Sequence, residues 1–279
     1  MTRPAPETPR LPWRYALKML ARSRSLGFTR DAARRSPAAK LAKFRWGGRD
    51  VFYRPGTSDP FVLYQVLLRT GEKAEYYVPP ALAPAVIVDI GSNIGGAILY
   101  FRTVFPQARI FGFEPHPQSF AVLQRNVAGM QGVTVLGCGL GDSDRRMAVA
   151  ASPNYSGFST QSSSAEHASL TRLTECEVRH AGDCLAELGI KQIDLLKIDC
   201  EGSEAEIFKA LPLELLQQTR WIVGEMHDAA GFEILSALAP HFDLDLKKRM
   251  FGSSFRFHAC NLTEAATLRG SFDRRSLQI

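Results

Sequence analysis

Long hydrophobic runs are absent from this chain of 279 residues. No apolar stretch reaches the roughly 18 residues that a membrane-spanning helix needs, so we expect no transmembrane segment. Basic residues interrupt every apolar run near the N-terminus, which argues against a secretory signal. The five cysteines have neither CxxC spacing nor the regular spacing of a disulfide framework. This predicts reduced thiols and a cytoplasmic location.

Positive charge is concentrated in the first 54 residues. They hold fourteen Lys or Arg against three acids, a net charge of +11, whereas residues 55–279 carry −5. A basic arm either contacts an anionic surface, nucleic acid or acidic glycan, or is simply solvated. Apolar side chains such as Trp13 and Leu17 lie among the basic ones. We interpret residues 1–42 as a basic leader, partly disordered or helical, which packs on the domain or touches lipid.

The most informative stretch is residues 86–96, which read VIVDIGSNIGG. A short apolar β run ends on an acid and is followed by a turn rich in glycine. An amphipathic helix then runs from about residue 95 to residue 105 and stops before a proline. Such a strand–turn–helix unit lets a small molecule approach the backbone at a helix N-terminus.

The residue in the middle of this turn distinguishes between cofactors. A dinucleotide fingerprint needs three spaced glycines, the second so that the pyrophosphate can approach the main chain. These positions hold Gly91, Asn93 and Gly96, and an Asn side chain would crowd a pyrophosphate. S-adenosylmethionine (SAM) carries no phosphate, and its ammonium group suits an acid such as Asp89. The turn therefore favours SAM over NAD.

Strands alternate with helices through most of the chain, which predicts an α/β fold with a mostly parallel sheet. Segments 242–248 and 254–260 predict an antiparallel hairpin at one edge. Residues 43–54 indicate a smaller hairpin, and Asp59–Leu68 a helix after it. The other expected strands cover residues 86–90, 109–113, 133–138, 193–199 and 221–226, and the other expected helices about 117–129, 183–189, 203–216 and 230–239.

These elements predict that the chain is divided into four consecutive parts. They are the leader at 1–42, an N-terminal hairpin and helix extension at 43–84, a SAM-binding domain at 85–260 and a C-terminal tail at 261–279. Residues 143–181 form an insertion rich in Ser and Thr, flanked by short strands at about 145–150 and 172–178. A connection this long is usually functional or disordered. We interpret it as a flap that faces the substrate, with a mobile loop as the alternative.

Four motifs resemble the FkbM family of SAM-dependent methyltransferases in order and spacing. They are VDIGSNIG at 88–95, FEPHP at 113–117, LLKIDCEGSE at 195–204 and GEMH at 224–227. The resemblance spans roughly residues 43–260. It implies a Rossmann-like class I methyltransferase fold that ends in an antiparallel edge hairpin. It also implies O-methylation, so we expect a small-molecule, sugar, glycan or natural-product acceptor whose identity does not carry over.

On the cofactor side, the resemblance places the methionine ammonium of SAM at Asp89, directly or through water. The turn beneath the methionine part would consist of Gly91, Ser92, Asn93 and Gly95. A tight turn without a ligand is the alternative interpretation of these residues.

Two further acids complete the expected cofactor site. Glu114 ends the second strand, where a carboxylate accepts two hydrogen bonds from a ribose diol. This acid alone does not separate SAM from NAD, because both cofactors carry the diol. Asp142 follows the third strand, where this fold contacts the adenine edge, and a simple turn Asp is its alternative.

The order of the strands predicts which residues contact the methyl acceptor. In this fold the first, fourth and fifth strands lie side by side, about 4.8 Å apart, and ligands sit beyond their carboxyl ends. Asp199 and His227 end the fourth and fifth strands and should reach one site. His227 is the first candidate for the base that takes the hydroxyl proton, because its ordinary pKa of about 6.5 suits neutral pH. Asp199 is the second, and Glu225 would fix the imidazole or pair with Lys197.

Side chains near these strand ends could instead hold a divalent cation, since carboxylates and imidazole are suitable ligands. They do not form a tight ligand signature, so we expect no metal. The residues concerned are Asp199, Glu201, His227 and Asp228.

Three rival functions deserve comparison with O-methylation. An NAD-dependent epimerase or dehydrogenase is opposed by Asn93 and by the missing Tyr-x-x-x-Lys pair. An RNA methyltransferase is suggested by the basic leader, but the remaining chain is acidic and has no aromatic-rich basic patch, so no nucleic acid is expected at the core. The third is a non-catalytic protein that keeps a SAM pocket. The leader and the first hairpin are also candidates for a homodimer contact.

Overall fold

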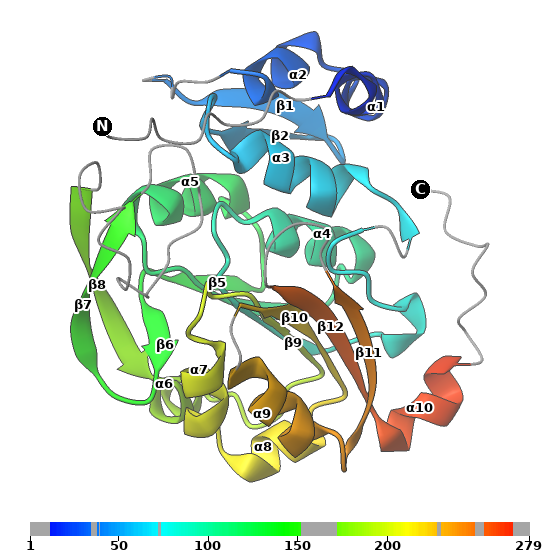
Figure 1. Ribbon diagram of the computed structural model, residues 1–279, viewed down its shortest axis with the longest axis vertical. Coiled ribbons are helices and arrows are strands. Elements are labelled where there is room, and N and C mark those ends of the chain that lie inside the picture. Colours follow the sequence, from blue (N-terminus) through cyan, green and yellow to red (C-terminus); the bar gives the residue numbers. More distant parts are fainter. Residues whose placement is uncertain are drawn as a thin grey trace, which may run out of the picture.

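A computed structural model describes residues 12–34, 38, 40–71, 74–151, 172–227, 230–248 and 254–269. Its centre is a seven-stranded sheet in the order β11-β12-β10-β9-β3-β4-β5 (Figure 1). Strands β3, β4, β5, β9 and β10 are parallel, whereas β12 runs antiparallel to both β10 and β11. The predicted parallel sheet with an antiparallel edge hairpin is therefore confirmed. The strands are β3 (Val86–Ile90), β4 (Arg109–Phe113), β5 (Val133–Leu136), β9 (Leu195–Ile198), β10 (Trp221–Met226), β11 (Phe242–Lys248) and β12 (Phe255–Asn261).

Helices cover both faces of the sheet (Figure 1). Two of them, α4 (Gly96–Val104) and α5 (Pro117–Val127), lie on the side of the N-terminal elements. The other side carries α6 (Ala181–Glu187), α7 (Glu204–Ala210), α8 (Leu213–Gln218) and α9 (Ala230–Leu238). Each side has its own apolar core. Because both faces are covered, the central strands are almost completely buried, which explains their mostly apolar sequences.

The N-terminal elements pack on the α4 and α5 side. They are α1 (Trp13–Ser23), α2 (Leu26–Ala32), the hairpin β1 (Ala42–Trp46) and β2 (Arg49–Tyr53), and α3 (Asp59–Leu63). The predicted hairpin is present, with Phe44 opposite Val51. The expected helix over 59–68 is α3 followed by a π-helical turn, η1 (Tyr64–Leu68). Arg54 and Asp59 fix its start, with Arg54 Nε 2.7 Å from Asp59 Oδ2.

Three boundaries differ from the sequence expectation. The helix expected over 203–216 is broken into α7 and α8 because Pro212 has no N–H to donate to the preceding turn. The strand expected over 133–138 stops at Leu136. The expected C-terminal tail begins with a helix, α10 (Leu262–Arg269), whose Leu268 is buried in the core.

A separate three-stranded sheet follows β5. It consists of β6 (Gly139–Gly141), β7 (Arg145–Ala151) and β8 (Arg172–His180), in the order β6-β8-β7. The short strands expected on either side of the insertion are thus present as β7 and β8. The proposed flap falls on residues 152–171, outside the described residues. Among the residues that are described, no helix has the length and apolarity needed to cross a bilayer.

Candidate active site

A cavity of about 410 Å³ opens beyond the carboxyl ends of β3, β4, β9 and β10. Its volume falls in the range of about 300–1,000 Å³ that is typical of small-molecule sites. One wall comes from the N-terminal extension, because Phe61 of α3 and Gln65 of η1 line the cavity. The extension is therefore part of the site and not only an appendage of the sheet.

The turn between β3 and α4 has the backbone that its sequence predicts. Gly91, Asn93 and Gly95 all have positive φ angles, of 81°, 48° and 90°. A Cβ on Gly91 would lie 1.9 Å from the carbonyl oxygen of Asp199, so only glycine fits. Ser92 Oγ closes the turn by donating to the Asp89 carbonyl at 2.9 Å. Of these residues, Gly91, Ser92 and Asn93 line the cavity.

One atom of this turn indicates that the cavity binds a ligand. Asn93 Oδ1 is buried and has no hydrogen-bond partner among the described residues. A buried acceptor without a donor is costly, and such groups commonly meet a ligand or ordered water. The residues of the turn thus fit a bound small molecule.

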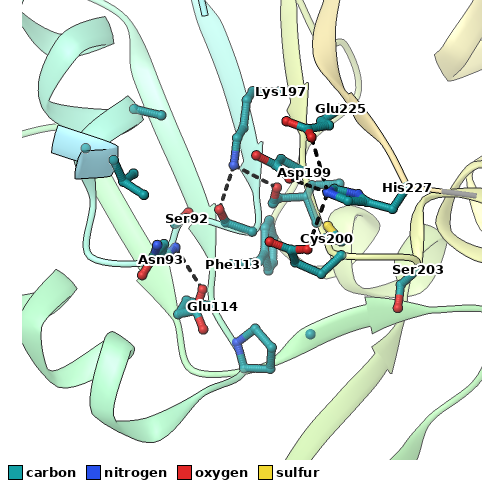
Figure 2. A pocket seen from close by; sticks show the side chains of 18 of the residues that line it. Ser92, Asn93, Phe113, Glu114, Lys197, Asp199, Cys200, Ser203, Glu225 and His227 are labelled. Carbon is teal, nitrogen blue, oxygen red and sulfur yellow. Dashed lines mark hydrogen bonds and ion pairs between the residues drawn. The ribbon is translucent and has the colours of Figure 1, made fainter. Parts of the chain in front are cut away.

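Glu114 faces the same turn from the end of β4. Its Oε2 accepts from the backbone N–H of Asn93 at 2.7 Å and its Oε1 from that of His116 at 2.9 Å. Burial raises the pKa of Glu114 to about 7, although the two backbone donors oppose that shift. Each carboxylate oxygen keeps a further lone pair for a ligand. Figure 2 shows Asn93 and Glu114 together on one side of the cavity.

Asp89 does not line the cavity. Its carboxylate is 0% exposed and lies 3.0 Å from Lys197 Nζ of β9. Lys197 also donates to the Gly91 carbonyl at 2.6 Å. Burial lowers the pKa of Lys197, but the charges of Asp89 and Asp199 more than offset this and raise it overall. The contact of Asp89 with the methionine ammonium, directly or through water, stays a prediction, while the structure shows that Asp89 pairs with Lys197 and that this pair supports the turn from below.

His227 lies on the opposite side of the cavity within a group of acids, which we call the His227 cluster (Figure 2). Its Nδ1 is 2.9 Å from Glu204 Oε1. Three carboxylates surround Nε2: Glu201 at 3.4 Å, Glu225 at 3.6 Å and Asp199 at 3.7 Å. Burial lowers the pKa of His227, but the Glu204 hydrogen bond and the charges of Asp199 and Glu201 raise it to about 9. The imidazole is thus positively charged at neutral pH.

The structure brings Asp199 and His227 together as predicted, but two of their partners were missed. Glu204, rather than Glu225, makes the short contact with the imidazole ring. Glu204 is the last residue of the LLKIDCEGSE motif, but the motif by itself does not indicate a contact with the imidazole. Tyr76 donates its hydroxyl to Asp199 Oδ2 at 2.5 Å from 123 residues away, and no sequence signal indicates this contact.

Asp142 is not brought to the cavity. Its side chain is 62% exposed and pairs with Arg145 Nη1 at 3.0 Å. The reason is that β6 leaves the main sheet and pairs with β8, which carries residues 141 and 142 away from the end of β5. Its partner Arg145 does line the cavity.

Part of the His227 cluster also has the spacing of cation ligands. Asp199, Glu201 and His227 offer ligand atoms that all lie within 4.8 Å of one another. Burial and the charge of Asp199 raise the pKa of Glu201 to about 7. Asp228, the fourth residue considered from the sequence, lies outside the described residues. The expectation that no metal is needed stays a prediction.

Comparison with known proteins identifies the family. The Methyltransferase FkbM domain matches residues 89–252. "Methyltransferase 1" of Beauveria bassiana is 33% identical over 174 residues, which cover 56% of this chain and 70% of that protein. The 31-O-demethyl-FK506 methyltransferase FkbM of Streptomyces tacrolimicus is 29% identical over 189 residues, 56% of this chain and 71% of that protein.

The hexuronic acid methyltransferase AglP of Haloferax volcanii is 32% identical over 144 residues, which cover 51% of this chain and 56% of that protein. The match to the family domain itself extends over more than half of the chain and includes the turn, Glu114 and the His227 cluster. The chain therefore belongs to the FkbM family of methyltransferases.

Proposed function

We propose that this chain transfers a methyl group from SAM to a hydroxyl of a sugar, glycan or natural-product acceptor. The observation that carries the proposal is the placement of the two sides of the cavity. The turn with Glu114 stands on one side, and a histidine held among carboxylates stands on the other (Figure 2). Two relatives are named for a 31-O-demethyl compound and for hexuronic acid, which supports a hydroxyl-bearing acceptor.

The cofactor side would be built from the turn and Glu114. When bound, SAM supplies a methyl group on a positively charged sulfur. Asn93 Oδ1, which lacks a donor, and the free lone pairs of Glu114 would accept hydrogen bonds from it. Asp89 would act through Lys197, by holding the Gly91 carbonyl in place. Asp142 has no role in this arrangement.

On the acceptor side, His227 would take the hydroxyl proton. Transfer to an alkyl hydroxyl needs a base, because the neutral oxygen is a weak nucleophile. Glu204 accepts the Nδ1 proton and so directs Nε2 toward Asp199 and the cavity. Asp199, held by the Tyr76 hydroxyl, would orient the acceptor. We propose that no metal is needed, because the imidazole is itself the base when it is neutral and balances part of the acidic charge when it is protonated.

Cofactor choice is the first experimental test. We expect SAM and S-adenosylhomocysteine to bind the purified protein and NAD not to bind, because Asn93 stands where a pyrophosphate needs glycine. Isothermal titration calorimetry with each compound measures this. Binding of NAD in preference to SAM would refute the proposed function.

The same titration tests Glu114. The Glu114→Ala variant should lose at least about 1.5 kcal/mol of SAM affinity, which is the scale of a hydrogen bond to a charged group. Glu214→Ala, which removes an exposed acid of α8, is the matched control and should bind SAM normally. An unchanged dissociation constant for Glu114→Ala would remove the ribose assignment and leave the methyltransferase proposal intact.

A further inference from the structure

Helix α1 presents an outward face that is both apolar and basic. Met19 and Ser23 are its buried residues. Successive residues of an α-helix turn by about 100°, so Trp13 and Leu17 lie together on the outer side. Their side chains are 67% and 56% exposed. Large apolar groups left in water beside one another mark an interaction surface.

Basic side chains surround these apolar groups. Arg14 and Lys18 are exposed one position further round the same helix. After α1 the chain exposes Leu26, at 72%, and more cations. We call these residues together the α1–α2 patch: Trp13, Arg14, Leu17, Lys18, Arg24, Leu26 and Arg30.

No exposed acid balances this charge between residues 12 and 34. The segment has one acid, Asp31, which is 6% exposed. Asp31 accepts a hydrogen bond from the Tyr53 hydroxyl at 3.0 Å, and its Oδ1 lies 3.6 Å from Arg34 Nη1 and 3.9 Å from Arg30 Nε. Arg30 is therefore the patch cation that has an acid beside it, whereas Arg14, Lys18 and Arg24 form no ion pair with the described residues.

We propose that the α1–α2 patch binds the surface of an anionic membrane. Tryptophan and leucine beside lysine and arginine are the composition of helices that lie in the lipid–water interface. The cations would contact acidic headgroups and the apolar side chains would enter between them. This inference concerns a surface outside the cavity and does not depend on the proposed function.

Two other occupants agree less well with these residues. A symmetric second copy would place the same patch against itself, so that cations would face cations. Single-stranded nucleic acid would suit the cations, but Leu17 and Leu26 are aliphatic and cannot stack on bases as aromatic side chains do. Both remain outcomes that the experiment separates.

The test is flotation of the full-length protein with lipid vesicles. We expect binding to vesicles of equal parts phosphatidylcholine and phosphatidylserine, and little binding to phosphatidylcholine alone. The Arg14→Glu/Lys18→Glu variant should reduce partitioning by at least about twentyfold, because each cation at an anionic surface contributes about fivefold. Trp13→Ala/Leu17→Ala should reduce it by about tenfold or more. Binding should also weaken as salt rises from about 0.1 M to about 1 M.

Matched controls use exposed residues elsewhere on the surface. Leu213→Ala removes a side chain that is 68% exposed on α8, and Lys191→Glu reverses an exposed charge outside the patch. Both should bind vesicles normally, and all four variants should keep SAM affinity and circular dichroism. Equal binding to neutral and anionic vesicles, or none to either, would overturn the proposal. Two other results would assign a different partner. If the protein sedimented as a dimer and the patch variants did not, the partner would be a second copy. If it bound RNA but not vesicles, and the patch variants lost RNA binding, the partner would be RNA.

Discussion

Replacing His227 by alanine should lower the turnover number by about a hundredfold or more, the usual contribution of a general base. SAM binding should remain intact, because the ring lies on the side of the cavity away from Asn93 and Glu114. The measurement combines single-turnover kinetics with calorimetry on the same preparation. His241→Ala is the matched control, since that histidine is exposed and contacts Gln217.

The pKa of His227 also predicts the direction in which activity changes with pH. The pKa of His227 is raised to about 9, so the ring is protonated at neutral pH and becomes a base only as pH rises. The value of kcat/KM, which reports the free enzyme, should therefore increase with pH toward about 9. The positive sulfur of SAM should lower this pKa, and the inflection in kcat should lie at lower pH. Near-normal turnover of His227→Ala would instead assign the base to Asp199.

The largest stability effect should come from the Asp89–Lys197 pair. Lys197→Met would leave the Asp89 carboxylate buried without a counter-charge and should cost about 3–5 kcal/mol of unfolding free energy. Both side chains are almost completely buried, at 0% and 2% exposure, so water cannot replace the lost partner. Urea unfolding monitored by circular dichroism measures the change.

A second variant separates charge from packing. Asp89→Asn/Lys197→Met removes both charges and should recover a large part of the loss, because no ion then stays buried alone. Lys209→Met, whose side chain is 69% exposed, breaks the surface pair with Glu233 and should change stability by less than about 1 kcal/mol. If Lys197→Met were as stable as this control, the pair would not be the support of the turn.

The frame of the site could be predicted because its signals are local. An apolar run that ends on Asp89, followed by Gly91, specifies a strand and a tight turn within a few residues. The family resemblance then supplied the neighbours of the strand, and β3, β9 and β10 do lie side by side. That order is what brings Asp199 and His227 to one place.

The contacts that tune the site could not be predicted, because they depend on three-dimensional placement. Tyr76 reaches Asp199 only because the N-terminal extension folds over the sheet. Glu204 belongs to a recognisable motif, but the direction of its side chain is set by the backbone N–H groups of Cys200 and Gly202. The exposure of Asp142 could not be predicted either, because the sequence gave no sign that β6 would pair with β8 outside the main sheet.

The most direct test of the account is a crystal structure of the protein soaked with S-adenosylhomocysteine. We predict density in the cavity between the turn at residues 91–96 and Glu114, with the ribose hydroxyls at the Glu114 carboxylate and the sulfur facing the His227 cluster. Density bound elsewhere, or a cavity that stays empty because the Asn93 side chain blocks it, would contradict the assignment.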